Sequence, residues 1–373
     1  MTNFRRIVVA LSCIFILAGA QLAAGEVTMG GSVDVNLPPV AYDWDGEKGV
    51  GAYYETSLWF NSNLSPNSKV YLDLGMDNYD DDKGIYLEPS DWEIYVDRAS
   101  VWVDLNQALR LRQPFSIEFE VGMFDIGPYT DNSVTWAGPE KISSWRFDDW
   151  DGKVGDLSGS AQLSLFAENW GFQFAQALNL TEFMTRFYYI TGPMEFSVGY
   201  TDDLGYLFDD NSDTDFFREA SLTAQATYEA DIVPGVTLKV PVNGLFDLAK
   251  EETDDTWIWY SSGFNLKFDS LMLAAAAYGS VQEDYYLEST SIDVCYWPSF
   301  LEGLCIWWTG YMNPNWDPVM SGMDIGGEYW IGNIRITGGY AYLPDGSGGY
   351  DPASYGALWT DKSGVYLQFH TEF

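Results

Sequence analysis

Closely spaced carboxylates are the residues of this sequence best placed to do chemistry. Glu118 and Glu120 alternate with apolar residues, and a long polar stretch with further acids follows them. Carboxylates gathered around a narrow space attract cations and repel anions, because their fields add there. The acids that we single out for such a site are Glu118, Glu120, Asp125, Asp131, Glu140, Asp148, Asp149 and Asp151.

Other reactive side chains are scarce. The 373 residues include one histidine and three cysteines, too few for a histidine-based catalytic centre or a common zinc site. Phosphate-binding glycine loops and the HExxH and GxSxG motifs do not occur. A formal charge of −37 argues against binding to nucleic acid. We therefore expect no enzyme activity, no cofactor, no metal centre and no nucleic-acid partner.

The segments that would position these acids alternate between apolar and polar residues, with a period of two. Odd positions from Val365 to Phe373 hold Val, Leu, Phe, Thr and Phe, whereas even positions hold Tyr, Gln, His and Glu. Successive side chains of a strand point to opposite faces, so this pattern predicts a strand with one apolar and one polar face. His370 falls on the polar face. The same alternation recurs in residues 27–36, 69–77, 115–123 and 194–200.

The first 25 residues have the features of a secretory signal peptide. Two arginines precede an apolar stretch that is too short to cross a bilayer as a helix, and small residues follow it. We expect cleavage after Ala24 or Gly25, which leaves 16 basic against 55 acidic side chains and a charge of −39. The predicted organisation is a signal peptide over residues 1–25 and one β-domain over residues 26–373.

Two all-β architectures fit the alternation. A soluble sandwich would turn the apolar faces inward, whereas a transmembrane barrel would turn them toward lipid. We favour the barrel, because most apolar faces carry no formal charge and aromatic residues gather near strand ends, as in Trp257–Tyr260 and Tyr340–Tyr342. Short turns alternate with long polar connections. We count about 18 strands, and 16 is the alternative, because the connection between 172–178 and 183–190 is very short.

Two segments resemble a known family. The ending Val365–Phe373, with its terminal aromatic, resembles the recognition signal of bacterial outer-membrane β-barrels, although Thr371 stands where an aromatic is frequent. The segment Gly122–Tyr129 leads from the fifth strand into a long loop, as in the general porins. The resemblance implies an antiparallel, up-and-down transmembrane barrel whose third loop folds into the lumen. It also implies a homotrimer in contact with the lipid of the outer membrane of a diderm bacterium.

The resemblance extends the candidate site across the lumen. In general porins, bases on the early strands oppose loop carboxylates at the constriction, and Lys69 and Arg98 occupy the corresponding region here. On the polar faces of the predicted strands, acids outnumber bases. We therefore expect a preference for cations, whereas a wide lumen at physiological salt would screen these charges and give weak selectivity.

Two further features leave alternatives open. Cys295 and Cys305 flank a predicted turn with matching parity, so they could form a cross-strand disulfide in an exported protein or remain free thiols. The acidic loops over 77–91, 202–215 and 247–255 could bind calcium, although solvated acidic loops are commoner.

Three functions remain after these exclusions. The leading hypothesis is a passive diffusion channel for small hydrophilic solutes and ions that prefers cations. A sugar-selective porin is the nearest alternative, with Trp136, Trp145 and Trp150 of the long loop as stacking surfaces. A barrel that conducts nothing and acts as an adhesin or structural protein is the third.

Overall fold

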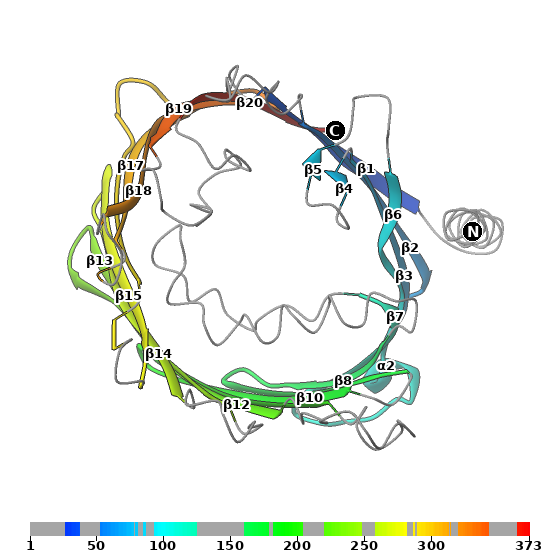
Figure 1. Ribbon diagram of the computed structural model, residues 1–373. Coiled ribbons are helices and arrows are strands. Elements are labelled where there is room, and N and C mark those ends of the chain that lie inside the picture. Colours follow the sequence, from blue (N-terminus) through cyan, green and yellow to red (C-terminus); the bar gives the residue numbers. More distant parts are fainter. Residues whose placement is uncertain are drawn as a thin grey trace, which may run out of the picture.

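The chain forms one large β-sheet that closes on itself, seen end-on in Figure 1. The computed structural model describes residues 27–37, 53–77, 79–80, 85–86, 93–124, 160–178, 182–203, 220–247, 258–281, 286–287, 289–312, 314, 320–342 and 364–373. The signal peptide predicted over residues 1–25 lies outside these residues, as does the long loop after residue 124.

Eighteen strands make up the barrel, so the larger of the two predicted counts is confirmed. The strands are β1 (Val27–Leu37), β2 (Tyr53–Ser65), β3 (Ser68–Asp77), β6 (Glu93–Asp104), β7 (Ser116–Met123), β8 (Ser160–Phe166), β9 (Trp170–Ala177), β10 (Glu182–Thr191), β11 (Met194–Asp203), β12 (Ala220–Val233), β13 (Val236–Asp247), β14 (Ile258–Lys267), β15 (Leu271–Ser280), β16 (Ser289–Tyr296), β17 (Leu304–Met312), β18 (Met320–Ile331), β19 (Ile334–Tyr342) and β20 (Gly364–Glu372). The hairpin in doubt, β9 with β10, is present.

The described chain contains few other elements. Strands β4 (Tyr79–Asp80) and β5 (Ile85–Tyr86) pair only with each other. Helix α2 (Leu105–Ala108) lies between β6 and β7, and the Asp104 side chain caps its first turn by accepting the Gln107 N–H. None of the helices in the described part of the chain is both long and apolar enough to cross a membrane.

Antiparallel pairing runs without interruption around the ring. Each strand pairs with its neighbours in the chain, and β1 pairs with both β2 and β20. The final residue completes the join, because Phe373 N donates to Gly31 O at 3.0 Å and Gly31 N donates to Phe373 O at 3.1 Å. Closure leaves no unpaired sheet edge, which is a requirement for backbone that faces lipid.

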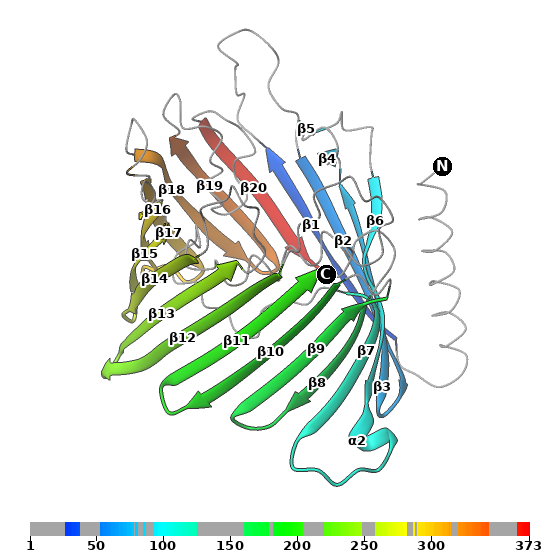
Figure 2. The same cartoon turned by 60° about the horizontal axis from the view of Figure 1, so that its bottom comes forward.

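Tight turns gather at one rim, as the alternation of short and long connections predicts. Figure 2 shows α2 and the turns of several hairpins at the lower rim, with the strands inclined to the barrel axis. The turn after β10 has Gly192 at φ 56°, and the turn after β18 has Gly332 at φ 62°. Glycine fits these positions because a left-handed backbone strains residues with a Cβ.

The two faces of the wall differ as the period of two predicts. Large apolar side chains on the outer face are exposed; for example, Val198 is 49% and Ile325 is 49% exposed. The neighbouring inward positions hold buried polar residues such as Thr309 and Asp324. Among the described residues, buried apolar side chains form two small clusters, one around Met184 and Phe124 and another around Trp307. A soluble sandwich with its apolar residues packed inside is therefore excluded.

Candidate functional site

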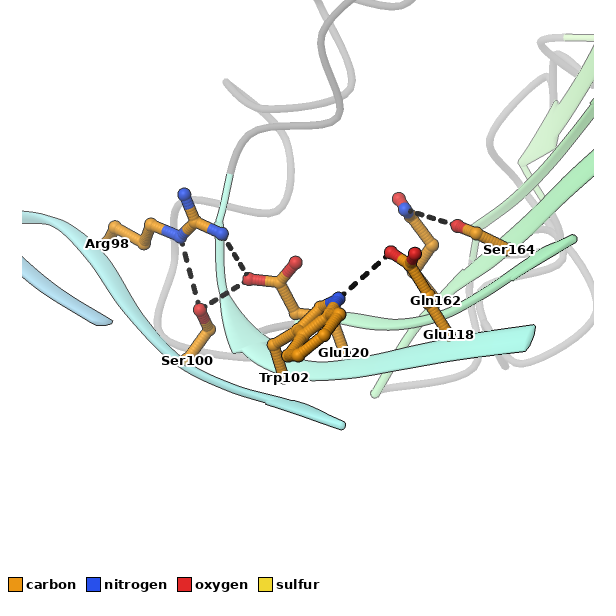
Figure 3. A network of polar contacts seen from close by, with 7 residues as sticks. All are labelled: Arg98, Ser100, Trp102, Glu118, Glu120, Gln162 and Ser164. Atoms are coloured by element: carbon orange, nitrogen blue, oxygen red, sulfur yellow. Dashed lines mark hydrogen bonds and ion pairs between the residues drawn. The ribbon is translucent and has the colours of Figure 1, made fainter. Parts of the chain in front are cut away.

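Four of the predicted site residues lie together on the inner wall of β3, β6 and β7. The register pairs Lys69 with Trp102 and Trp102 with Glu120, so one row crosses three strands. Glu118 lies in the next inward row on one side of it, and Arg98 lies two inward rows away on the other side. Figure 3 shows the side chains from β6 and β7 converging on this patch, which we call the early-strand wall.

Arg98 and Glu120 form the centre of the early-strand wall. An Nη2 atom of Arg98 lies 2.6 Å from Oε1 of Glu120, and the Ser100 hydroxyl donates to the same oxygen at 2.5 Å. Arg98 Nε also donates to Ser100 Oγ at 3.2 Å, which closes a three-residue network. The guanidinium lies 4.0 Å above the ring of Tyr71. Arg98 is thus held in one orientation by an ion pair and a cation–π contact.

Glu118 has a different environment from Glu120. Its two carboxylate oxygens accept hydrogen bonds from the Trp102 indole at 3.0 Å and from the Ser116 hydroxyl at 3.0 Å. Neither donor carries a charge, and among the described residues no basic side chain pairs with Glu118. Asp104 lies directly across from it on β6. The negative charge of Glu118 is therefore fixed in place but not neutralised by a neighbour.

Lys69, like Arg98, makes a cation–π contact with an aromatic ring of the early-strand wall. Its ammonium nitrogen lies 5.1 Å from the centre of the Trp102 ring. Trp102 thus contacts a cation with its face and a carboxylate with its N–H. Trp102 and Tyr71 were not among the predicted site residues, although their inward parity on the strands that carry Lys69 and Arg98 was a usable signal.

The remaining predicted site residues cannot be placed. Their positions fall outside the described residues, so the opposition of the loop acids to Lys69 and Arg98 stays a prediction, as does the folding of the third loop into the lumen. The residues concerned are Asp125, Asp131, Glu140, Asp148, Asp149 and Asp151.

The rest of the inner wall is polar and rich in acids. Gln173 accepts a hydrogen bond from Arg186 Nε at 2.6 Å, and Glu229 and Lys239 face each other in the register of β12 and β13. Glu229 and Asp231 are inward acids that were not among the predicted residues of the inner wall, although their parity on β12 matches that of the inward Gln225 and Thr227. Among the described side chains, inward acids outnumber inward bases. Those acids are Asp34, Asp73, Asp104, Glu118, Glu120, Glu195, Glu229, Asp231, Asp293, Asp324, Glu328 and Glu372, and the bases are Lys69, Arg98, Arg186, Lys239, Lys267 and Arg335.

His370 lies on the inner face, as its parity predicts. Its Nδ1 atom lies 2.8 Å from Oδ1 of Asp34 on β1, and Nε2 lies 3.4 Å from Glu372. The contact with Asp34 joins the last strand to the first. His370 therefore belongs to the closure of the barrel, and no nucleophile or metal ligand set surrounds it in the described structure.

The predicted disulfide is not formed. Cys295 and Cys305 are free, buried thiols that pack with Trp307. The turn between β16 and β17 is centred one residue later than the sequence suggested, so the register pairs Cys295 with Trp307 instead of Cys305. Gly303 at φ 84° and the hydrogen bond from Leu301 N to Pro298 O at 3.1 Å shape this longer turn.

Comparison with known proteins gives matches among solved structures only. No model of a known protein family matches the sequence, and no curated protein matches it. Acinetobacter baumannii OccAB2 superposes over 94% of this chain and 98% of its own, with a TM-score of 0.50 and 11% identity. A mutant of the Rh. blastica porin covers 93% of this chain and 100% of its own, with a TM-score of 0.48 and 12% identity. The match to OccAB2 shows a shared barrel fold.

Proposed function

We propose that this chain is a passive diffusion channel in the outer membrane of a diderm bacterium. It passes small hydrophilic solutes and ions and prefers cations. The observation that carries the proposal is the division of the wall into an exposed apolar outer face and a polar, acid-rich inner face. Barrels of 16 to 18 strands are wide enough to leave an aqueous passage, and an apolar outer band matches the hydrocarbon of a bilayer.

Cation preference follows from the balance of charge on the inner wall. The two bases of the early-strand wall are engaged, Arg98 by Glu120 and Lys69 by Trp102. Glu118 keeps an unneutralised charge beside them. Anions that enter the barrel thus meet bases that are already partnered, whereas cations meet carboxylates, and rings of carboxylates favour cations in channels of other architectures.

Transport of solutes tests the first half of the proposal. Liposomes that contain the refolded chain should swell at a rate that falls as the size of an uncharged solute increases. The rate should rise in proportion to solute concentration, because passive diffusion does not saturate. Liposomes that hold the protein and show no swelling beyond empty ones would contradict a channel and would favour a surface barrel.

A sugar-selective channel would give a different result in the same assay. It predicts saturable flux and block by an oligosaccharide, because sugars would bind to aromatic surfaces in the passage. The aromatic rings of the early-strand wall do not support this function, since Arg98 and Lys69 already cover Tyr71 and Trp102. The loop tryptophans Trp136, Trp145 and Trp150 lie outside the described residues.

Assembly as a homotrimer is part of the proposal and rests on the resemblance to general porins. Chemical cross-linking of the protein in mild detergent should give dimers and trimers as the largest products. A single monomeric species in cross-linking and in light scattering would remove this part and leave the channel proposal untouched.

A further inference from the structure

The connection between β6 and β7, residues 105–115, is the longest of the described connections at the rim where the tight turns gather. We call this end of the barrel the turn rim. The connection begins with helix α2, which Figure 2 shows below the ends of the strands. Figure 1 shows α2 at the edge of the ring, beside β7 and β8, and not across the lumen. The connection therefore adds a small protrusion to the turn rim.

Hydrogen bonds hold the β6–β7 connection in one conformation. The Asn106 side chain donates to Phe115 O at 2.6 Å and accepts from Ile117 N at 3.0 Å. Leu111 N donates to Asn106 O at 2.8 Å. Arg110 has φ 55° and is the single non-glycine residue of the described chain in the left-handed region, where a side chain is strained. These hydrogen bonds use no leucine or arginine side chain, so the fold of the connection does not account for those residues.

The exposed side chains of the connection alternate between leucine and arginine. Leu109 is 62% and Leu111 is 39% exposed, and the neighbouring Arg110 and Arg112 are exposed as well. Residues 105–115 contain no acid. In the part of the chain that the structure describes, no carboxylate forms an ion pair with either arginine. The connection thus presents two unpaired cations and two apolar side chains together.

This basic surface differs from the rest of the turn rim. The other connections between strands at this rim contain no base, and three of them contain an acid, namely Glu168, Asp269 and Glu302. The whole chain has a formal charge of −37. The two arginines are therefore a local site for an anion in an otherwise acidic protein.

Aromatic side chains on the outer face place the β6–β7 connection at the edge of the lipid. Phe115 has the outward parity of β7, and its ring centroid lies 5.8 Å from that of Trp170. Trp170 is opposite Tyr189, which is 39% exposed on the outer face. Tryptophan and tyrosine gather at the interface between hydrocarbon and headgroups, and bacterial barrels have their short turns on the periplasmic side. The exposed residues 107–114 therefore lie at the level of the periplasmic headgroups.

We propose that the β6–β7 connection binds an anionic phospholipid of the periplasmic leaflet. Arg110 and Arg112 would contact the phosphate, because a guanidinium donates paired hydrogen bonds to phosphate oxygens. Leu109 and Leu111 would enter the boundary between headgroups and acyl chains. A soluble acidic partner would leave both leucines without an apolar contact, whereas the lipid that covers the outer face extends to them. This site goes beyond the proposed function and does not depend on conduction.

The test is lipid-dependent thermal unfolding of the refolded full-length barrel in micelles of a neutral detergent. Anionic phosphatidylglycerol or zwitterionic phosphatidylcholine is titrated, and loss of the folded band on a gel gives the unfolding temperature. A lipid that binds only the folded state raises this temperature with its concentration. Phosphatidylglycerol should act at a concentration at least fivefold lower than phosphatidylcholine. Inorganic phosphate should have no effect, because it has no acyl chains for the leucines to contact.

Substitutions assign the effect to the connection. Arg110→Asn and Arg112→Gln should each raise the required phosphatidylglycerol concentration about fivefold, the factor for about 1 kcal/mol per base near an anionic lipid surface. Asparagine is used at position 110 because it tolerates a left-handed backbone. Leu109→Ser should weaken the binding of both lipids. Lys267→Gln is the matched control, since it removes an exposed base at the same rim but on the inner face.

Arg112→Lys keeps the charge and should retain most of the affinity. Together with Arg112→Gln it completes the test if Arg110→Asn does not fold. An equal response of the wild type to both lipids, or no response, would overturn the proposal. An equal loss of affinity in Arg112→Gln and Lys267→Gln would also overturn it, as would a full response to inorganic phosphate. A barrel that prefers phosphatidylglycerol but passes no solute would refute the channel and keep the lipid site.

Discussion

At the scale of single residues, charge on the inner wall depends on how each carboxylate is partnered. Glu120 shares its charge with Arg98, whereas Glu118 receives only neutral donors. Sequence parity placed both acids correctly on the inner face, because alternation fixes the face of every strand residue. It could not predict the partners, since these depend on which strands meet and in which register.

Glu118→Gln should lower the preference for K⁺ over Cl⁻. The substitution removes an unneutralised charge and keeps the shape of the side chain. Charge interactions at partly exposed sites are worth about 0.2–1 kcal/mol, so the permeability ratio should fall by about 1.4- to 5-fold. Bilayer recordings measure the ratio, and Ser164→Ala on the same wall is the neutral control. An unchanged ratio would mean that Glu118 does not contact the ion path.

Arg98→Ala should shift the ratio in the opposite direction. Removal of the guanidinium leaves Glu120 with Ser100 as its remaining partner on the early-strand wall and so adds a negative charge to the passage. The same recordings should therefore show a stronger K⁺ preference than in the wild type. A weaker preference would show that Arg98 acts on ions through something other than its pairing with Glu120.

At the scale of elements, the strands were predictable and the turns were only partly so. Apolar alternation in stretches such as 115–123 identified the strands, and the hairpin of β9 and β10 settled their number. The turn between β16 and β17 is centred one residue later than predicted because Gly303 and the Pro298 carbonyl extend it, so Trp307 and not Cys305 lies opposite Cys295. A turn conformation is set by local hydrogen bonds that a hydrophobic pattern does not reveal.

The closure of the barrel between β1 and β20 depends on the contact between His370 and Asp34. Both side chains are largely buried, at 13% and 17% exposure, and lie 2.8 Å apart. Asp34→Ala should destabilise the closed barrel by about 1.5–3 kcal/mol, the range for a hydrogen bond to a charged group, because alanine cannot accept from His370. Gel mobility after stepwise heating measures the temperature at which the folded band is lost. Glu372→Gln, whose contact with His370 is longer and exposed, should change this temperature little.

Adjacent positions on β11 test which face meets lipid. Val198 points outward and is exposed, whereas Ser197 points inward and donates to Gln225 at 2.7 Å. Val198→Lys should lower the stability in bilayers by about 2–4 kcal/mol, the cost of a lysine near the membrane centre. Ser197→Lys should fold normally. Equal folding efficiency of both variants in lipid vesicles would contradict the assignment of the faces.

At the scale of the whole molecule, the acidic charge has two separate locations. Part of the −37 lies on the inner wall, where acids outnumber bases among the described residues, and the remainder lies elsewhere in the chain. The all-β barrel, its strand number and the orientation of its faces could all be predicted, because each follows from a repeated local pattern. The paths of the long connections could not, since their polar composition has no such period.

The predicted signal peptide implies that the mature protein is shorter than the full sequence. Removal of residues 1–25 should leave a chain that begins near Glu26, with cleavage after Ala24 or Gly25. Intact-mass measurement of the protein purified from outer membranes gives the cleavage position to a single residue. A mature protein that retains Arg5 and Arg6 would contradict the signal peptide.

The reversal potential of single channels in a KCl gradient tests the central claim most directly. A polar, acid-rich inner wall should pass current and give a reversal potential of the sign that K⁺ preference requires, with a magnitude that declines as salt screens the carboxylates. Either a barrel that carries no current or one whose reversal potential has the sign of Cl⁻ preference would contradict the account.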